Sequence, residues 1–212
     1  MKYEIITWVN SELWTQRAEA PTATWQHRPT AYWESDPRLS DPVWAQWRET
    51  AALRESGQSA GQTVKHSGRA QAQIRHLRSS TADYVIWLDA HVTQHQQITD
   101  SQLQSLMPSE SELCTFFSAG LDPSREPSWI AYNMRATRLK QFVNRLEDMF
   151  LTQEIFSLPD QHRTAVWDHC RLRGNYLSRS LQNTKTHSMS FSKSALAPWF
   201  RELTGLKKQN RE

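Results

Sequence analysis

Residues 83–91 read Asp83-Tyr84-Val85-Ile86-Trp87-Leu88-Asp89-Ala90-His91, and this is the most informative stretch of the chain. The run from Tyr84 to Leu88 is apolar throughout, which is typical of a strand buried on both faces of a parallel sheet. Asp89 and His91 follow its carboxyl end, where ligands bind in open α/β sheets. Taken alone, these residues fit a strand that ends in a polar turn better, so their meaning depends on the rest of the chain.

Length and composition bound the class of protein. At 212 residues the chain fits a single domain, predicted to span residues 1–212, with a core of its own. The hydrophobic fraction is 38% and the mean hydropathy is −0.72. No apolar stretch approaches the roughly 20 residues that cross a membrane, and the amino terminus does not resemble a signal peptide. Two cysteines, Cys114 and Cys170, are too few for a disulfide framework. These features predict a cytoplasmic protein with no membrane partner.

The net charge of +3 is unevenly distributed along the chain. From Arg163 to Glu212 there are ten Lys or Arg residues and three acidic residues. This basic quarter suits an anionic ligand such as a nucleotide diphosphate or a nucleic acid. The alternative is a solvated surface that ends in a basic tail over residues 201–212. The ten tryptophans can form core or groove walls, or stack on a base or sugar ring.

Hydrophobic patterns predict alternating strands and helices. Strands are expected at 3–9, 30–33, 84–88, 113–117 and 129–133, with the last close to the first in the sheet. Helices are expected near Ser11, after an Asp41 cap with Pro42 in the first turn, and at 69–79, 102–107, 139–150 and 158–173. Residues 35–68 are predicted to be a mobile insertion. The fold class is α/β, a single Rossmann-like domain with a mostly parallel sheet flanked by helices.

Four segments, taken together, resemble a known family. They are 82–91, 129–133, 154–162 and the ending from His187 to Lys208. They are similar to GT-A fold glycosyltransferases, in particular to small phage-encoded proteins that are assigned as DNA-modifying glycosyltransferases. The similarity covers most of the chain from about Lys65 onward. Two departures stand out: most relatives have Asp-x-Asp where this chain has Asp89-Ala90-His91, and Arg163 follows His162 where relatives often have an acid.

The resemblance implies a GT-A-like domain with a divalent cation that bridges the diphosphate of a nucleotide sugar. Carboxylate and imidazole ligands suit Mn²⁺, or Mg²⁺ as the second choice. The implied ligands are Asp89, His91 and a third histidine near the carboxyl terminus, for which His187 is preferred over His162. A histidine is more often a surface or core residue than a ligand, and that alternative is left open for each.

Further roles follow from the same resemblance. Asp168 is the candidate general base on the acceptor, or alternatively holds the hydroxyls of the donor sugar, and His162 is a candidate wall of the catalytic site. The residues expected to bind the nucleotide sugar are Lys65 and Arg69 at the phosphates, Asp83 at the nucleoside, and Lys207 and Lys208 over the diphosphate. Each of these residues also has a structural alternative. Lys65 and Arg69 can simply begin a solvated helix, and Asp83 can be a turn residue. Lys207 and Lys208 can belong to a basic tail, and Asp168 can pair with Arg171 or Arg173.

The predicted function is therefore metal-dependent transfer of a sugar from a nucleotide-diphosphate sugar to a hydroxyl. The acceptor suggested by the phage resemblance is a hydroxymethylated pyrimidine in DNA, flipped out or single-stranded, in the host cytoplasm. A glycan, protein or small-molecule acceptor is an alternative. Two other classes also stay open: a non-catalytic nucleic-acid-binding protein, and a degenerate glycosyltransferase that has lost its metal.

Overall fold

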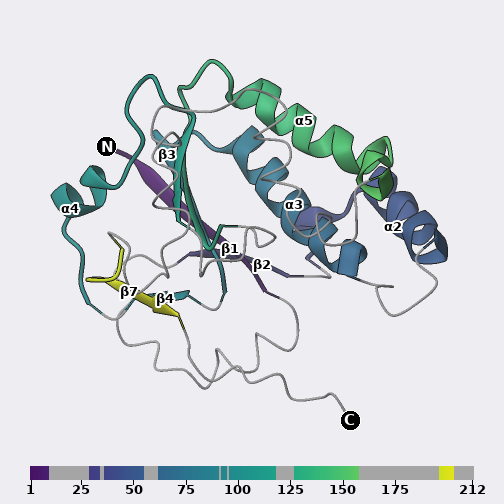
Figure 1. The fold of residues 1–212 in the computed structure, drawn as a ribbon, viewed down its shortest axis with the longest axis horizontal. Helices are drawn as coiled ribbons and strands as arrows, with labels where there is room; N and C mark the ends of the chain where they lie inside the picture. The colour runs from purple at the N-terminus through teal and green to yellow at the C-terminus, as the bar shows by residue number, and fades with distance from the viewer. Residues whose placement is uncertain are drawn as a thin grey trace, which may run out of the picture.

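The structure is a computed structural model that describes residues 1–9, 29–33, 36–54, 62–90, 92–94, 96–117, 127–157 and 196–202. Figure 1 shows their helices and strands around a central sheet. The helices predicted near Ser11 and over 158–173 lie outside these residues.

Five strands form the central sheet, in the spatial order β2-β1-β3-β6-β5. β1 pairs in parallel with β2 and β3, whereas β6 pairs antiparallel with β3 and with β5. The strands are β1 (Tyr3–Val9), β2 (Thr30–Trp33), β3 (Tyr84–Leu88), β5 (Cys114–Phe117) and β6 (Trp129–Asn133). Four of the five strands therefore run in one direction, and β6 runs against them.

This topology confirms the coarse fold prediction and corrects its detail. The described residues form a mixed α/β fold that is compatible with a Rossmann-like arrangement. The sheet is mixed, because two of its four neighbouring pairs are antiparallel. The strand 129–133 was expected close to the first strand, and β3 lies between the two.

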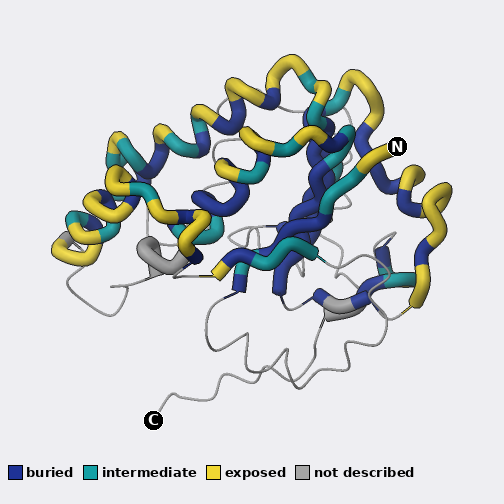
Figure 2. Tube along the Cα trace, turned by 180° about the vertical axis from the view of Figure 1, so that it is seen from behind, coloured by how far each residue is buried: buried dark blue, intermediate teal, exposed yellow. Residues whose placement is uncertain are grey.

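The two faces of the sheet pack against different layers. Ile6, Val85 and Trp87 point to the face covered by α2 (Pro42–Arg54), α3 (Gln62–Ser79) and α5 (Leu139–Leu151). Ile86 and Leu88, one residue out of phase, point to the other face. That face is covered by α4 (Asp100–Ser105) and residues of a small second sheet. Figure 2 shows the strands buried between these layers and the outer helix turns exposed. β3 is apolar throughout because both of its faces are covered.

Several predicted elements are confirmed. β3 and β6 match their predicted ranges, and α5 buries the expected stripe of Leu139, Phe142, Val143, Leu146, Met149 and Phe150. The Asp41 carboxylate caps α2, since its Oδ1 accepts a hydrogen bond of 2.9 Å from the backbone N–H of Val43. Two short 3-10 helices, η1 (Pro37–Leu39) and η2 (Glu154–Ser157), complete the helical side.

Residues 35–68, which were predicted to be a mobile insertion, include η1, α2 and the first two turns of α3. Trp44 and Trp47 of α2 are buried and lie against Phe150, with ring centroids 5.4 Å from it in both cases. Trp47 also stacks on Phe156 at 6.0 Å. This part of the segment is a layer of the main core, because its indoles fill the space between α2 and α5.

A chain of hydrogen bonds fastens α3 to the first two strands. The Tyr32 hydroxyl lies 2.8 Å from His76 Nδ1, and His76 Nε2 lies 2.8 Å from Glu4 Oε2. The Ser80 hydroxyl donates to the same Glu4 oxygen at 2.7 Å. Hydrogen bonding from Ser80, together with that from His76, holds the pKa of Glu4 below its usual value of 4.5 despite partial desolvation.

We expect this Glu4 contact to make stability depend on acid. Because the pKa of Glu4 is lower in the folded than in the unfolded chain, its contribution is present above about pH 4.5 and is lost as the pH falls through the folded pKa. The Glu4→Gln variant should therefore show a flatter fall of unfolding free energy below pH 5 than the unaltered chain. Urea unfolding at pH 3 to 7 measures this. Equal slopes in both proteins would show that the contact adds nothing.

The small second sheet joins distant parts of the sequence. β4 (Val92–Gln94) pairs antiparallel with β7 (Phe200–Glu202), with Val92 opposite Glu202. Phe200 and Leu196 are buried against the α4 side of the central sheet. The segment just after Asp89 is therefore held by residues from the carboxyl-terminal part of the chain.

None of the helices in the described ranges is both long enough and apolar enough to cross a lipid bilayer.

Candidate functional site

The backbone of Asp89 is fixed at the carboxyl end of β3. Its N–H donates to the Ser128 carbonyl at 2.8 Å, and its own carbonyl accepts from the Val92 N–H at 2.9 Å. One bond extends the pairing of β3 with β6, and the other closes the turn into β4. The position predicted from the sequence for a ligand-binding carboxylate is therefore held from both sides.

The Asp89 side chain forms an ion pair with Arg69 of α3. Arg69 Nη2 lies 2.8 Å from Asp89 Oδ1 and also donates to the Pro127 carbonyl at 3.0 Å. The two side chains are mostly buried, with 14% of Arg69 and 11% of Asp89 exposed. Such a pair, removed from water on most sides, is screened far less than a surface pair. The structure thus brings together two residues that the sequence predicted separately.

The indole of Trp87 completes this group. Trp87 Nε1 donates to Asp89 Oδ1 at 3.0 Å, and the Arg69 guanidinium carbon lies 5.0 Å from the centroid of the Trp87 ring. Trp87 precedes Asp89 by two residues, so both side chains leave the strand on the α3 side. One buried tryptophan therefore orients the carboxylate and supports the arginine.

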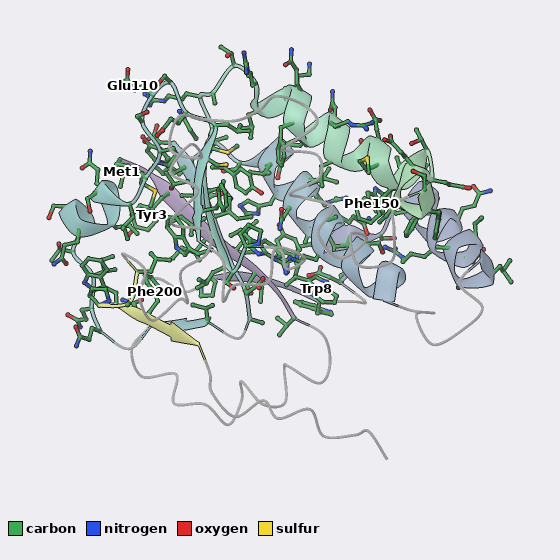
Figure 3. The ribbon with its side chains drawn as sticks, viewed as in Figure 1. Met1, Tyr3, Trp8, Glu110, Phe150 and Phe200 are labelled. Carbon is green, nitrogen blue, oxygen red and sulfur yellow. The ribbon has the colours of Figure 1, made fainter. Side chains whose placement is uncertain are left out.

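Gly68 lets α3 approach β1 closely enough for this contact. A Cβ atom at Gly68 would lie 3.0 Å from Nε1 of Trp8 and 3.1 Å from its Cζ2. Figure 3 shows Trp8 beside the first half of α3. Because Arg69 is the next residue, the close packing at Gly68 sets the distance from which Arg69 reaches Asp89.

The donor chemistry of this group fits a divalent cation only in part. A carboxylate is a suitable oxygen ligand for Mn²⁺ or Mg²⁺. However, Oδ1 of Asp89 already accepts a hydrogen bond from Trp87 and forms the ion pair with Arg69, and the nearby guanidinium charge opposes a second cation. In the described part of the chain, no three His, Cys, Asp or Glu side chains lie together in an arrangement that would hold a metal.

Several predicted site residues lie outside the described residues: His91, His162, Asp168, His187, Lys207 and Lys208. His91 is flanked by Ala90 and Val92, both of which are described. Glu202, opposite Val92, precedes Lys207 by five residues. Lys65 belongs to α3, one turn before Arg69, but its side chain is also outside the description.

Asp83 is not brought to this group. Asp83 precedes β3 and Asp89 follows it, and the six residue steps between them span about 20 Å in an extended chain. Asp83 accepts a hydrogen bond from the Lys2 N–H at 2.8 Å and pairs with Arg135. The Lys2 N–H is the main cause that lowers the pKa of Asp83, with the Arg135 charge adding to it. The predicted nucleoside contact would require a site at the other end of the strand.

A cavity of about 550 Å³ lies at that other end. It is lined by Met1, Asp83, Tyr84, Gln104, Glu110, Asn133 and Arg135. Met1 and Glu110 lie at the end of the sheet opposite Trp8 (Figure 3). The charged side chains Asp83 and Arg135 in its wall pair with each other, so the cavity and the Asp89 group are separate features.

Two groups of polar contacts were not predicted from the sequence. The first is the support of Asp89 by Trp87 and of Arg69 by the Pro127 carbonyl. The Trp87–Asp89 contact could have been predicted from their spacing, since residues two apart share a strand face. The second is Arg38, which binds the buried carboxylate of Asp36 through Nε at 2.9 Å and lies over the Tyr32 ring at 4.3 Å. It follows β2, and no pattern in the sequence marks it.

No model of a known protein family matches this chain, and no curated protein matches it in sequence. The class defined by the structure is thus the mixed α/β fold with a buried Arg–Asp pair at the carboxyl end of a central strand. The glycosyltransferase family stays a prediction from the resemblance.

Proposed function

We propose that this chain is a glycosyltransferase that moves a sugar from a nucleotide-diphosphate sugar to a hydroxyl acceptor. The observation that favours this function most is the direct contact of Arg69 with Asp89 beyond the carboxyl end of β3. Nucleotides bind at this edge in open α/β sheets. The cationic side chain can bind the phosphates, and the anionic side chain can bind the divalent cation that accompanies them.

The chemistry of the reaction explains why these residue types are useful. When the bond to the sugar breaks, negative charge develops on the leaving diphosphate. A guanidinium held in a site with little water stabilises that charge better than a mobile surface lysine. In the unliganded chain, Asp89 pairs with Arg69 and the Trp87 ring lies beside its guanidinium, so the cation is already at the edge of the sheet where the diphosphate would bind. A bound Mn²⁺ or Mg²⁺ would supply additional Lewis acidity at the diphosphate, with Asp89, His91 and His187 as proposed ligands.

The pairing of β4 with β7 supports a contribution from the basic carboxyl-terminal quarter. Val92 lies opposite Glu202, and Val92 is the third residue after Asp89. Lys207 and Lys208 follow Glu202 by five and six residues. An extended chain spans up to about 3.3–3.6 Å per residue, so these lysines are within about 20 Å of β7 along the chain. We propose that they bind the diphosphate, and that Asp168 and His162 serve the acceptor.

For the acceptor we propose a hydroxymethylated pyrimidine in DNA. The support is the excess of positive charge after Arg163 together with the resemblance to phage-encoded proteins. A competing proposal from the same charge is a nucleic-acid-binding protein without catalysis. That protein would bind DNA in a strongly salt-dependent way and would respond to no nucleotide sugar.

A thermal-shift screen tests the proposed function. Uridine, guanosine, cytidine and adenosine diphosphates and their sugars are added to the full chain, each with and without Mn²⁺. A ligand at 100 times its Kd adds about 2.7 kcal/mol of stability. This corresponds to a rise of about 5–10 °C in Tm for a chain of this size. We expect one nucleotide family to give such a rise.

The Asp89→Ala variant should lose this rise, whereas Glu110→Gln should keep it. Glu110 is an exposed carboxylate on the cavity at the other end of the sheet, so it controls for loss of charge alone. If no nucleotide raises Tm while DNA binds, the chain is a nucleic-acid-binding protein and the proposal fails. If the rise survives in Asp89→Ala, the site is elsewhere.

A further inference from the structure

Two cationic groups, the Arg69 guanidinium and the proposed divalent cation, would bind the same carboxylate of Asp89. In the structure, Oδ1 pairs with Arg69 Nη2 at 2.8 Å. In the proposed function, the same carboxylate also binds a divalent cation. Two positive groups at one mostly buried carboxylate repel each other, and the repulsion is strong where water is scarce. A free divalent cation must therefore compete with Arg69 for Asp89.

A diphosphate removes this conflict. A guanidinium binds phosphate through two parallel hydrogen bonds, at least as well as it binds a carboxylate. Arg69 turning from Asp89 to a phosphate keeps its charge paired. Asp89 then faces the cation without a competing guanidinium. The diphosphate draws Arg69 away from Asp89, and the cation then binds the freed carboxylate. Each ligand should therefore favour the binding of the other.

We infer that Arg69 exchanges partners, pairing with Asp89 in the unliganded chain and with a phosphate of the nucleotide after binding. The inference rests on the proposed function and adds an order to it: Asp89 becomes available to a cation only when a diphosphate is present. Arg69 thus binds the nucleotide directly and also couples its binding to that of the cation.

The surroundings of the pair suit such an exchange. Trp87 Nε1 donates to the same Oδ1 atom of Asp89, so the carboxylate keeps its orientation when Arg69 leaves. The guanidinium also contacts the Pro127 carbonyl and the face of the Trp87 ring, so it has partners other than Asp89. The Arg69 side chain is mostly but not fully buried, with 14% of it exposed.

Calorimetric titration of Mn²⁺ tests the exchange on the full chain, with and without the nucleotide diphosphate that gives the largest thermal shift. The unaltered chain should bind Mn²⁺ about tenfold more tightly with the nucleotide, within the usual range for coupled ligands. In Arg69→Met, which removes the charge and keeps much of the length, Mn²⁺ alone should bind about tenfold more tightly than to the unaltered chain. The nucleotide should then raise the Mn²⁺ affinity by less than it does in the unaltered chain, because only the direct binding of Mn²⁺ by the phosphates remains.

The matched control is Arg78→Met. Arg78 lies on the same helix and pairs with Glu147 at 2.6 Å, away from β3, so its loss should leave every Mn²⁺ affinity unchanged. Adding Asp89→Asn to Arg69→Met should abolish the gain. If Arg69→Met does not fold, Arg69→Lys replaces it. That variant keeps the charge but lacks the fork, so Mn²⁺ alone should bind as in the unaltered chain while the coupling to nucleotide weakens.

The failures are distinguishable. Mn²⁺ affinity that is equal or lower in Arg69→Met, measured without nucleotide, overturns the exchange. If the nucleotide raises the Mn²⁺ affinity of Arg69→Lys as much as that of the unaltered chain, the exchange is also overturned. If no nucleotide diphosphate binds to the unaltered chain, the proposed function fails, and this is a separate measurement from the Mn²⁺ titration.

Discussion

Replacing Asp89 by Asn should lower the free energy of unfolding by about 3–5 kcal/mol, the usual cost of removing one partner from a buried ion pair. The amide keeps the shape of the carboxylate and can still accept from Trp87 Nε1. It cannot neutralise Arg69, whose guanidinium remains mostly buried. The loss therefore comes from an uncompensated charge and not from a cavity.

Urea unfolding at pH 7 measures this change. Glu147→Gln is the matched control, because Glu147 pairs with Arg78, whose side chain is 44% exposed, and such a pair contributes at most about 1 kcal/mol. A double variant, Asp89→Asn with Arg69→Met, should recover much of the stability, since it removes both charges. If the two single losses simply add in the double variant, the pair is not coupled.

Replacing Trp87 by Ala should cost about 3–5 kcal/mol, because the indole is 1% exposed and its removal leaves a large cavity in the core. Trp87→Phe should cost less, because the ring still fills most of the space. It still removes the hydrogen bond to Asp89 Oδ1, so we expect it to weaken nucleotide binding more than its effect on stability suggests.

The comparison uses urea unfolding for stability and calorimetry for nucleotide affinity in the same samples. Trp33→Phe is the control, since Trp33 is 45% exposed at the end of β2 and its loss should change stability little. Nucleotide affinity in Trp87→Phe equal to that of the unaltered chain would show that the indole N–H plays no part in orienting Asp89.

The sequence predicted well those elements whose signals are local. The apolar run of β3, the stripe of α5 and the Asp41 cap of α2 depend on neighbours within one or two turns, and all three are as expected. The start of α3 was missed by seven residues. Residues 62–68 are mostly small or polar, so the first two turns lack the apolar period that marks the rest of the helix.

Predictions that depend on distant contacts succeeded less often. The place of β6 beside β3 is set by cross-strand packing, which no local pattern records. Trp44 and Trp47 gave no sign that the segment around them packs on α5, which is 95 residues further along. Asp89 and Arg69 were both singled out, but as ligands of different groups. Their ion pair depends on where α3 crosses the sheet, and on Gly68.

The strand pair β4–β7 has a consequence for how this chain is made. Val92 and Glu202 are partners across 110 residues, so their contact closes a very long loop and is expected to form late in folding. A ribosome delivers the chain from its amino terminus at about 5–20 residues per second. While Phe200 is still in the exit tunnel, β3 can pair with β1 and β6, but β4 lacks its partner strand β7. The pairing that follows Asp89 is therefore completed only after synthesis has passed Glu202.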